Sequence, residues 1–315
     1  MDNEHSAFLN AYTVKSLRAQ AAGNGLKNSY LLITPDASAA KSIFMLFAMM
    51  LHCKRGAGNV CFECAECKKI LSGNHADTRV CGGKLSVADV GGIIDDLYIK
   101  PLDGDYKMYY IPGIDGALAP AQNKLLKSLE EPPDYAIFFL SAANEDAVLK
   151  TVASRCEKHY EPSFEHQSAR AILEAEFQDD DFVANAVLCA DGFIDNARSM
   201  ITDAEFRRLF FECADMMNNL KNSGGVVGYI FKPLFEKERI KTTLNILETI
   251  ISATVRGIET RDDGLIFVRD TPAGVLNKYI FLIVAARKQA AYNVNPAAIA
   301  ENLLMNMLEV RYLCR

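Results

Sequence analysis

The chain has 315 residues, of which 50% are hydrophobic and 23% are charged. This is ordinary globular usage, and it excludes a mainly disordered chain, a collagen-like chain and a coiled-coil rod. The length predicts about two domains with a core that needs no disulfide bonds. Lys and Arg total 34 and Asp and Glu total 40, so the net charge of −6 gives the whole chain no bulk attraction for nucleic acid, although a local basic patch is compatible with that sum.

The first residues carry no basic segment followed by an apolar one, so no signal peptide is expected. The longest apolar runs, 43–51 and 279–286, are far shorter than the roughly 20 residues that cross a bilayer. We therefore expect a cytoplasmic protein without membrane contact. Nine cysteines, an odd number, then do not indicate a disulfide framework.

Short apolar runs alternate with helical patterns over the first 160 residues. The predicted strands are 30–34, 78–81, 107–111 and 136–141. The predicted helices are 39–52, 86–97 and 120–130. The second of these helices begins with a capping box of Ser86 and Asp89, in which Asp replaces the preferred Glu or Gln. Strands that are apolar throughout and separated by helices predict a parallel sheet covered on both faces.

Strand signals fade after residue 160. Predicted helices follow at 168–177, 182–190, 196–201, 204–220, 237–256, 272–292 and 296–313. The chain is therefore predicted to form an α/β module, then a small helical segment, then a helical bundle.

Four cysteines lie within fifteen residues, in the pattern Cys53-x7-Cys61-x2-Cys64-x2-Cys67. Four thiolates are the usual ligands of a structural zinc ion, and they leave no position open for water. The segment is too small to build its own core, so the metal would supply its folding energy. An iron–sulfur cluster is a chemical alternative, but the fourth cysteine lies upstream rather than downstream of the Cys-x2-Cys-x2-Cys run. A set of free thiols is the other alternative.

The segment 35–42 after the first strand reads PDASAAKS, which has the spacing of a phosphate-binding loop. Lys41 and Ser42 are in place, but Pro35 and Ala40 stand where the two glycines belong. The third strand ends in Pro-Gly rather than in metal-binding carboxylates, and we interpret Asp115 beyond it as a turn residue. These defects predict that the chain neither binds nor hydrolyses ATP, although an anion could still bind the exposed amides of the helix.

Two further motifs give the sequence a family resemblance. Residues 125–133 read LLKSLEEPP, and Ser154-Arg155-Cys156 follows the fourth strand. Together they resemble the clamp-loader branch of the AAA+ ATPases. The four-cysteine insertion and the segment 73–77, GNHAD, are similar to those of bacterial members. The gamma/tau ATPase subunits of that family share the fold but keep a working phosphate loop.

The resemblance implies an architecture and a role for one arginine. It implies an AAA+ type module at 1–161 with a zinc module at about 53–75, a helical lid at 162–207 and an all-α oligomerisation collar at 208–315. It implies that Arg155, with Ser154 in the same motif, reaches a neighbouring subunit's ATP as an arginine finger. The alternative is a structural arginine that pairs with a local carboxylate such as Glu157.

The sensor positions implied by the resemblance also depart from an active ATPase. The first sensor falls on Ala142 or Ala143, which have no hydroxyl to contact a γ-phosphate. At the second sensor Asp195 stands in place of the ATPase arginine, with Arg198 as another candidate. Both changes favour a subunit that does not turn over ATP.

The resemblance therefore implies a non-hydrolysing clamp-loader subunit. It would assemble with gamma/tau and delta subunits and help place the sliding clamp on primer-template DNA. It would have no ATPase or polymerase activity of its own, although it would belong to the DNA polymerase III complex. Two alternatives remain: an active gamma/tau-like ATPase, and a zinc-stabilised AAA+ interaction module without a clamp role.

Overall fold

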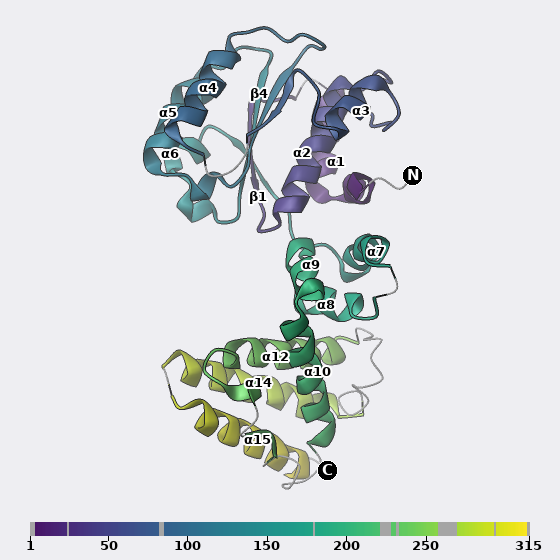
Figure 1. Cartoon of the computed structure of the whole chain (residues 1–315), viewed down its shortest axis with the longest axis vertical. Helices are drawn as coiled ribbons and strands as arrows, with labels where there is room; N and C mark the ends of the chain where they lie inside the picture. The colour runs from purple at the N-terminus through teal and green to yellow at the C-terminus, as the bar shows by residue number, and fades with distance from the viewer. Residues whose placement is uncertain are drawn as a thin grey trace. The chain divides into compact units, whose positions relative to one another are not determined.

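The chain folds into two compact units, Met1–Phe164 and Glu165–Arg315 (Figure 1). The computed structural model describes residues 4–23, 25–81, 85–178, 180–220, 228–230, 233–257, 270–292 and 294–313. The first unit ends three residues after the predicted α/β module. The further division of the second unit at residue 207 into a lid and a collar stays a prediction.

The first unit is built on a five-stranded sheet in the order β2-β3-β4-β1-β5, with every pair parallel. The strands are β1 (Ser29–Ile33), β2 (Thr78–Val80), β3 (Lys107–Ile111), β4 (Ala136–Ala142) and β5 (Glu157–Tyr160). Four of them confirm the predicted strands within a residue or two. β5 was not predicted, and it lies at the sheet edge with Leu31 of β1 opposite Lys158.

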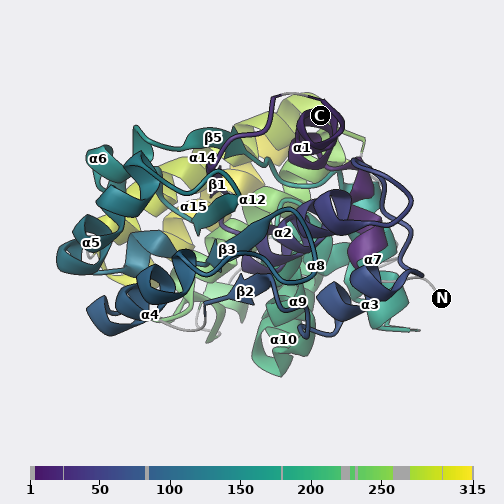
Figure 2. The same ribbon diagram turned by 90° about the horizontal axis from the view of Figure 1, so that it is seen from above.

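Helices cover both faces of this sheet, as a parallel sheet requires. They are η1 (Glu4–Asn10), α1 (Tyr12–Ala22), α2 (Ala37–His52), α3 (Ala65–Leu71), α4 (Val87–Leu97), η2 (Ile114–Gly116), α5 (Ala119–Glu130), η3 (Glu145–Ala147) and α6 (Lys150–Ala153). Figure 1 shows α1, α2 and α3 on one face and α4, α5 and α6 on the other. Figure 2, turned by 90°, again separates α4 and α5 from α2 and α3 across the sheet.

The two faces of the sheet have different cores because successive strand residues point to opposite sides. An aromatic cluster fills the α2 face, where the Phe44 and Tyr110 rings stack with centroids 4.8 Å apart and Tyr30 meets Phe47 edge-on at 5.1 Å. Aliphatic residues dominate the α4–α5 face, where Leu31 and Leu140 are fully buried. The α/β core therefore needs no help from the second unit.

Local signals fix where these helices start and stop. The predicted capping box is confirmed: Ser86 N–H donates to Asp89 Oδ2 at 2.8 Å, and Asp89 N–H donates to Ser86 Oγ at 3.2 Å. At the end of α5 the chain meets Pro132 and Pro133, which cannot continue a helix. The start of α2 is set by a buried acidic residue that is described with the site below.

The described residues of the second unit are helical. Their helices are α7 (His166–Glu176), α8 (Val183–Cys189), α9 (Ile194–Thr202), α10 (Ala204–Asn219), η4 (Pro233–Phe235), α12 (Ile240–Val255), α14 (Ala273–Ala291) and α15 (Pro296–Leu313). Phe182 and Phe210 form an edge-on pair in this core, with centroids 5.3 Å apart. The helices predicted after residue 160 are thus confirmed, with ends shifted by no more than three residues.

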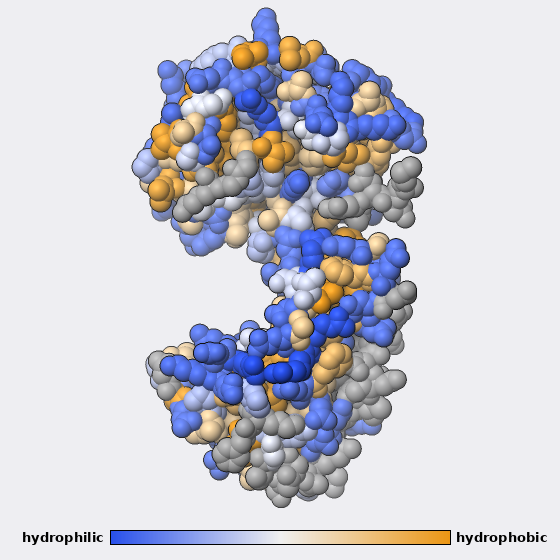
Figure 3. Space-filling view, viewed as in Figure 1, coloured by the Kyte–Doolittle hydropathy of each residue, from blue (hydrophilic) through white to orange (hydrophobic). Residues whose placement is uncertain are grey.

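On the face seen in Figure 3, the coloured surface of each unit is mostly hydrophilic, with hydrophobic residues scattered between polar ones. Across the residues that the structure describes, no helix combines the length and apolar character needed to cross a membrane.

Candidate functional site

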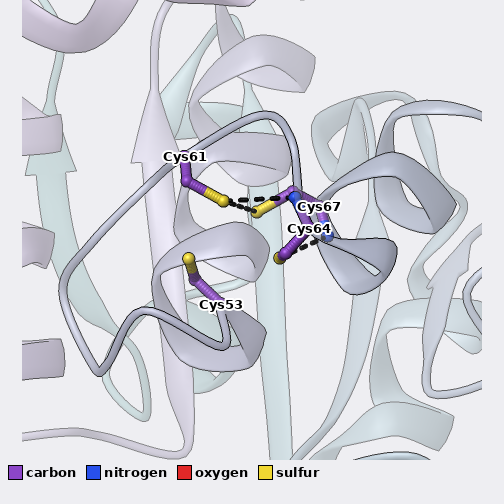
Figure 4. Close-up of side chains that lie close together, drawn as sticks. All are labelled: Cys53, Cys61, Cys64 and Cys67. Atoms are coloured by element: carbon purple, nitrogen blue, oxygen red, sulfur yellow. Dashed lines mark hydrogen bonds between the residues drawn. The ribbon is translucent and has the colours of Figure 1, made fainter.

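The four clustered cysteines converge on one point beside α2 and α3. Cys53 follows the last residue of α2, and Cys64 precedes the first residue of α3, which carries Cys67 in its first turn. Figure 4 shows the four sulfur atoms directed toward one another. All four sulfurs lie within 4.8 Å of one another, and the Sγ atoms of Cys61 and Cys67 are 3.9 Å apart.

These distances fit a tetrahedral metal site. Thiolates at about 2.3 Å from a tetrahedral zinc ion lie about 3.8 Å from one another, so only a small contraction of the cluster would be required. The chain returns on itself through Gly56 and Gly58, whose φ angles of 105° and 79° favour glycine. The prediction that the four cysteines form one metal-binding group is therefore supported by geometry.

Backbone amides already favour a thiolate in this cluster. The Cys64 N–H donates to Cys61 Sγ at 3.3 Å and lowers the pKa of the Cys61 thiol to about 6. Burial raises the pKa of Cys53 and of Cys67. A divalent cation binds the deprotonated form, so these two buried thiols would lose their protons on metal binding.

The segment 73–77, GNHAD, fastens the module to the sheet. The His75 ring is fully buried, its Nδ1 accepts the Asp77 N–H at 3.1 Å, and its Nε2 lies 3.3 Å from Glu66 Oε2. Burial lowers the pKa of His52 to about 4, so this imidazole is neutral where it packs on the His75 ring at 4.4 Å. Both histidines are therefore packing groups beside the cysteines, and neither belongs to the four-sulfur group.

The predicted phosphate loop is absorbed into a helix. α2 begins at Ala37, and the Ala40 N–H donates to the Asp36 carbonyl at 3.0 Å inside the first helical turn. The Asp36 side chain is buried, caps the helix through the Ala39 N–H at 3.1 Å and accepts the Ser38 hydroxyl at 3.0 Å. A carboxylate of the chain itself therefore occupies the end of the helix where a phosphate would bind.

Lys41 and Ser42, the two residues retained from the phosphate-loop pattern, have contacts that do not suit phosphate binding. Ser42 is buried, and its hydroxyl lies 3.0 Å from His5 Nδ1 in the N-terminal helix η1. Lys41 is exposed in the second turn of α2 and lines a cavity of about 320 Å³ with residues of α3 and β2, among them Leu71 and Val80. The structure thus does not bring Lys41 and Ser42 together into an anion cradle.

Asp115 has a structural task. It lies in η2 after β3, and its Oδ2 accepts the N–H groups of Ala143 at 3.2 Å and Asn144 at 3.1 Å. Its interpretation as a turn residue is confirmed. Ala142 ends β4, so this turn joins the ends of two neighbouring strands. Neither Ala142 nor Ala143, the two candidates for the first sensor position, has a side-chain hydroxyl.

Arg155 lies on the surface just after α6. Its guanidinium forms an ion pair with Glu130, the first Glu of the LLKSLEEPP stretch, and donates to the Thr151 carbonyl at 2.6 Å. The alternative of a pair with a carboxylate is therefore met in this structure, but by Glu130 rather than by the example Glu157, which lies 3.1 Å from His159 Nε2. Ser154 is exposed, and its hydroxyl donates back to the Thr151 carbonyl of its own turn at 3.2 Å. The ion pair of Arg155 with Glu130 therefore joins the Ser-Arg-Cys motif to the LLKSLEEPP stretch.

The residues that the resemblance implied as a second sensor, Asp195 and Arg198, lie in α9 of the second unit. Arg198 Nη1 donates to Asp195 Oδ1 at 2.7 Å, and Arg198 Nε donates to Glu176 Oε1 of α7 at 2.8 Å. Arg198, the other sensor candidate, is thus held between two carboxylates and fastens α9 to α7.

Sequence reasoning missed Asp36 as the residue that closes the loop. An Asp directly before a helix is a strong capping signal, so the information was present. It was masked because the spacing of Lys41 and Ser42 suggested that the same residues form a loop.

Comparison with known proteins gives the family relationship. The family described as "DNA polymerase III, delta subunit" matches residues 9–161. A delta-prime subunit of DNA polymerase III from Bacillus subtilis is 25% identical over 306 residues, covering 90% of this chain and 92% of that protein. This chain resembles the delta-prime subunit of DNA polymerase III.

Other relatives are matched over about half of this chain. A tau/gamma subunit from Haemophilus influenzae is 34% identical over 144 residues, which cover 43% of this chain and 21% of that protein. Seven of the tau, gamma and delta-prime relatives are matched over less than half of their own length. The crystal structure of a gamma subunit-related protein from Thermotoga maritima aligns with 95% of this chain and 98% of its own, at 14% identity and a TM-score of 0.41.

Proposed function

We propose that this chain is a non-hydrolysing, delta-prime-like subunit of a bacterial clamp loader. It would assemble with gamma/tau and delta subunits and help load the sliding clamp onto primer-template DNA. The observation that carries the proposal is the buried Asp36 carboxylate at the start of α2, where an active subunit needs free amides for phosphate. A like charge at that place repels ATP.

Nucleotide binding by the isolated chain tests this proposal. Titration calorimetry with Mg-ATP is expected to detect no binding at micromolar concentrations, and a gamma/tau subunit serves as the positive control. Micromolar affinity with turnover would replace the proposal by the active gamma/tau-like alternative. A chain that binds no ATP and also fails to assemble with gamma/tau and delta would favour an interaction module without a clamp role.

The arginine-finger role of Arg155 is supported by its exposure. Arg155 is held only by a surface ion pair and one carbonyl among the described residues, and an exposed pair contributes about 0–1 kcal/mol. Release toward a neighbouring γ-phosphate therefore costs little, and a forked guanidinium suits a phosphoryl group better than an ammonium. In this proposal the ion pair with Glu130 holds the Arg155 side chain until a neighbouring subunit binds ATP.

Reconstitution with gamma/tau, delta, clamp and primed DNA tests the finger. Arg155→Ala is expected to reduce ATP turnover at the neighbouring site that Arg155 would contact by about 10³-fold, while assembly is unchanged. Arg155→Lys is expected to restore little of that activity. Arg170→Ala is the matched control, because Arg170 also forms an exposed ion pair, with Glu174. Unchanged turnover in Arg155→Ala would remove the role.

The four-cysteine module is proposed to hold one structural zinc ion through Cys53, Cys61, Cys64 and Cys67. The sulfur geometry supports the proposal, and a closed set of four thiolates suits a structural role. Elemental analysis of the purified chain is expected to give about one equivalent of zinc. Cys61→Ser with Cys64→Ser should abolish it, whereas Cys213→Ser, a buried thiol of the second unit, should not.

A further inference from the structure

The loop between α4 and β3, residues 98–106, carries three strongly exposed apolar side chains. Tyr98, Ile99 and Leu102 are 65%, 56% and 78% exposed. Side chains of this kind on a loop are usually free to collapse onto the surface. Here the backbone beneath them is held by two separate sets of contacts.

The first set holds the beginning of the loop and comes from the sheet. The Lys107 ammonium of β3 is almost fully buried and donates to the Asp96 carbonyl at 3.0 Å and to the Ile99 carbonyl at 3.2 Å. This cation lies at the carboxyl end of α4, where the helix dipole favours it. Tyr98 and Ile99 are therefore fixed without any contribution from the four-cysteine module.

The second set holds the end of the loop and comes partly from Asp77, directly before β2, and partly from the four-cysteine module. The buried Asp77 carboxylate, which follows α3, accepts the Leu102 N–H at 2.8 Å and the Asp103 N–H at 2.6 Å. Lys69 of α3 pairs with Asp103 at 2.8 Å. Two backbone amides and one ion pair thus tie this end of the loop to α3 and to the segment after it.

A close packing contact completes the second set. A Cβ atom placed on Gly104 would lie 2.6 Å from Nδ1 of His52, so the loop backbone rests directly on that ring. His52 immediately precedes Cys53, and the same ring packs on His75. Of the groups that hold the end of the loop, His52 is therefore next to Cys53 in the chain and Lys69 lies on the short helix that begins after Cys64, whereas Asp77 lies beyond this helix, directly before β2.

We propose that the four-cysteine module positions the α4–β3 loop, so that metal release frees the Leu102 end of this loop while the Ile99 end stays fixed. Gathering the four sulfurs sets the direction of α3 and the end of α2, and the Lys69 and His52 contacts depend on both. The inference rests on the proposed metal site. It assigns the module a positioning task beyond its own folding.

The chain has no tryptophan, so a single introduced one reports on its own position. Leu102→Trp and Ile99→Trp form a matched pair, because both side chains are exposed and lie on the same loop. Each variant is compared in the metal-loaded full chain and after stripping by a chelator, with metal content measured in parallel. The readouts are fluorescence anisotropy and hydrogen exchange of residues 98–106.

Stripping is expected to lower the anisotropy of Trp at position 102 and to raise amide exchange at 102–104 about tenfold or more. The Ile99→Trp variant should change little. In the metal-loaded chain, Asp77→Ala added to Leu102→Trp should reproduce the loss of anisotropy while one equivalent of metal is retained. That variant separates the coupling from collapse of the module.

Three results would overturn the inference, and they are distinguishable from one another. A stripped chain whose Leu102→Trp anisotropy is unchanged would remove the positioning role and leave the metal site intact. A chain that binds no metal, even after incubation with zinc, would remove the proposed site and the inference together. Equal changes at 99 and 102 would also contradict it, because they would show general unfolding rather than a directed contact.

Discussion

Asp36 carries the strongest residue-scale argument about nucleotide binding. Its carboxylate satisfies the Ala39 amide that would otherwise be open to an anion. Asp36→Ala is expected to lower the free energy of unfolding by about 1 kcal/mol, the usual contribution of a helix cap. Urea unfolding measures this, and Asp36→Ser, which keeps a capping oxygen, should lose much less.

The same variant separates two reasons for the proposed absence of ATP binding. In Asp36→Ala the repelling charge is gone, but residues 37–40 are still helical and offer no loop. We therefore expect no gain of ATP affinity in calorimetry. A gain to micromolar affinity would show that charge alone, and not the shape of the backbone, closes the site.

Gly104 gives a second residue-scale prediction. Its backbone lies so close to the His52 ring that a methyl group has no room, and His52 is buried. Gly104→Ala is expected to destabilise the chain by about 1–3 kcal/mol, the cost of overpacking. Gly116→Ala is the control, because nothing lies within 4 Å of its Cβ position, and thermal unfolding should show it near the parent value.

At the scale of elements, α1 is held by a residue from the far end of the first unit. Glu161 is buried after β5, and its carboxylate accepts the N–H groups of Tyr12 at 3.3 Å and Thr13 at 2.9 Å. The residue before α1 is Ala11, which offers no side-chain cap. Glu161 therefore takes the place of a local cap.

Removal of that carboxylate should release the helix. Glu161→Ala is expected to cost about 1–3 kcal/mol, because two amides lose their acceptor, and to raise hydrogen exchange first in residues 12–17. Glu161→Gln keeps one oxygen and should lose less. Glu165→Ala changes an exposed acid nearby and should leave α1 protected, so an equal effect of both alanine variants would contradict the cap.

The contact between Glu161 and α1 also illustrates why some elements can be predicted from the sequence and others cannot. The four apolar strands and the amphipathic helices are predictable because their signals are local. α1 is not, because its cap lies 149 residues from Tyr12. β5 was missed because residues 157–160, EKHY, are polar, and only the pairing with β1 makes them a strand. The short helix α3 is capped by Cys64 of the four-cysteine cluster rather than by a usual capping residue.

The same distinction holds for the site. The four cysteines could be grouped from sequence because they lie within fifteen residues, and geometry supports that group. The pair of Arg155 with Glu130 joins residues 25 apart in the chain, and no local pattern selects Glu130 over Glu157. Spacing in the sequence therefore predicted the group of four cysteines better than it predicted which charged residues form an ion pair.

At the scale of the whole molecule, the two units have separate cores, and all four cysteines of the proposed metal site lie in the first. Structural zinc sites of this size contribute on the order of 10 kcal/mol of binding free energy, which is linked to the folding of the unit that holds them. Metal removal is therefore expected to destabilise the first unit selectively. A single melting temperature cannot resolve this effect, because a chain of two units need not unfold in one step.

Hydrogen exchange read separately for each unit resolves it. After chelation, amides of β3 and β4 should exchange faster near the midpoint of thermal unfolding, whereas amides of α12 and α14 should keep their rates. Cys61→Ser with Cys64→Ser is the control: it should show the fast rates in β3 and β4 from the start and give no response to the chelator. Equal acceleration in α12 and α14 would mean that the units unfold together, and the metal would then stabilise the whole chain rather than the sheet that presents Arg155.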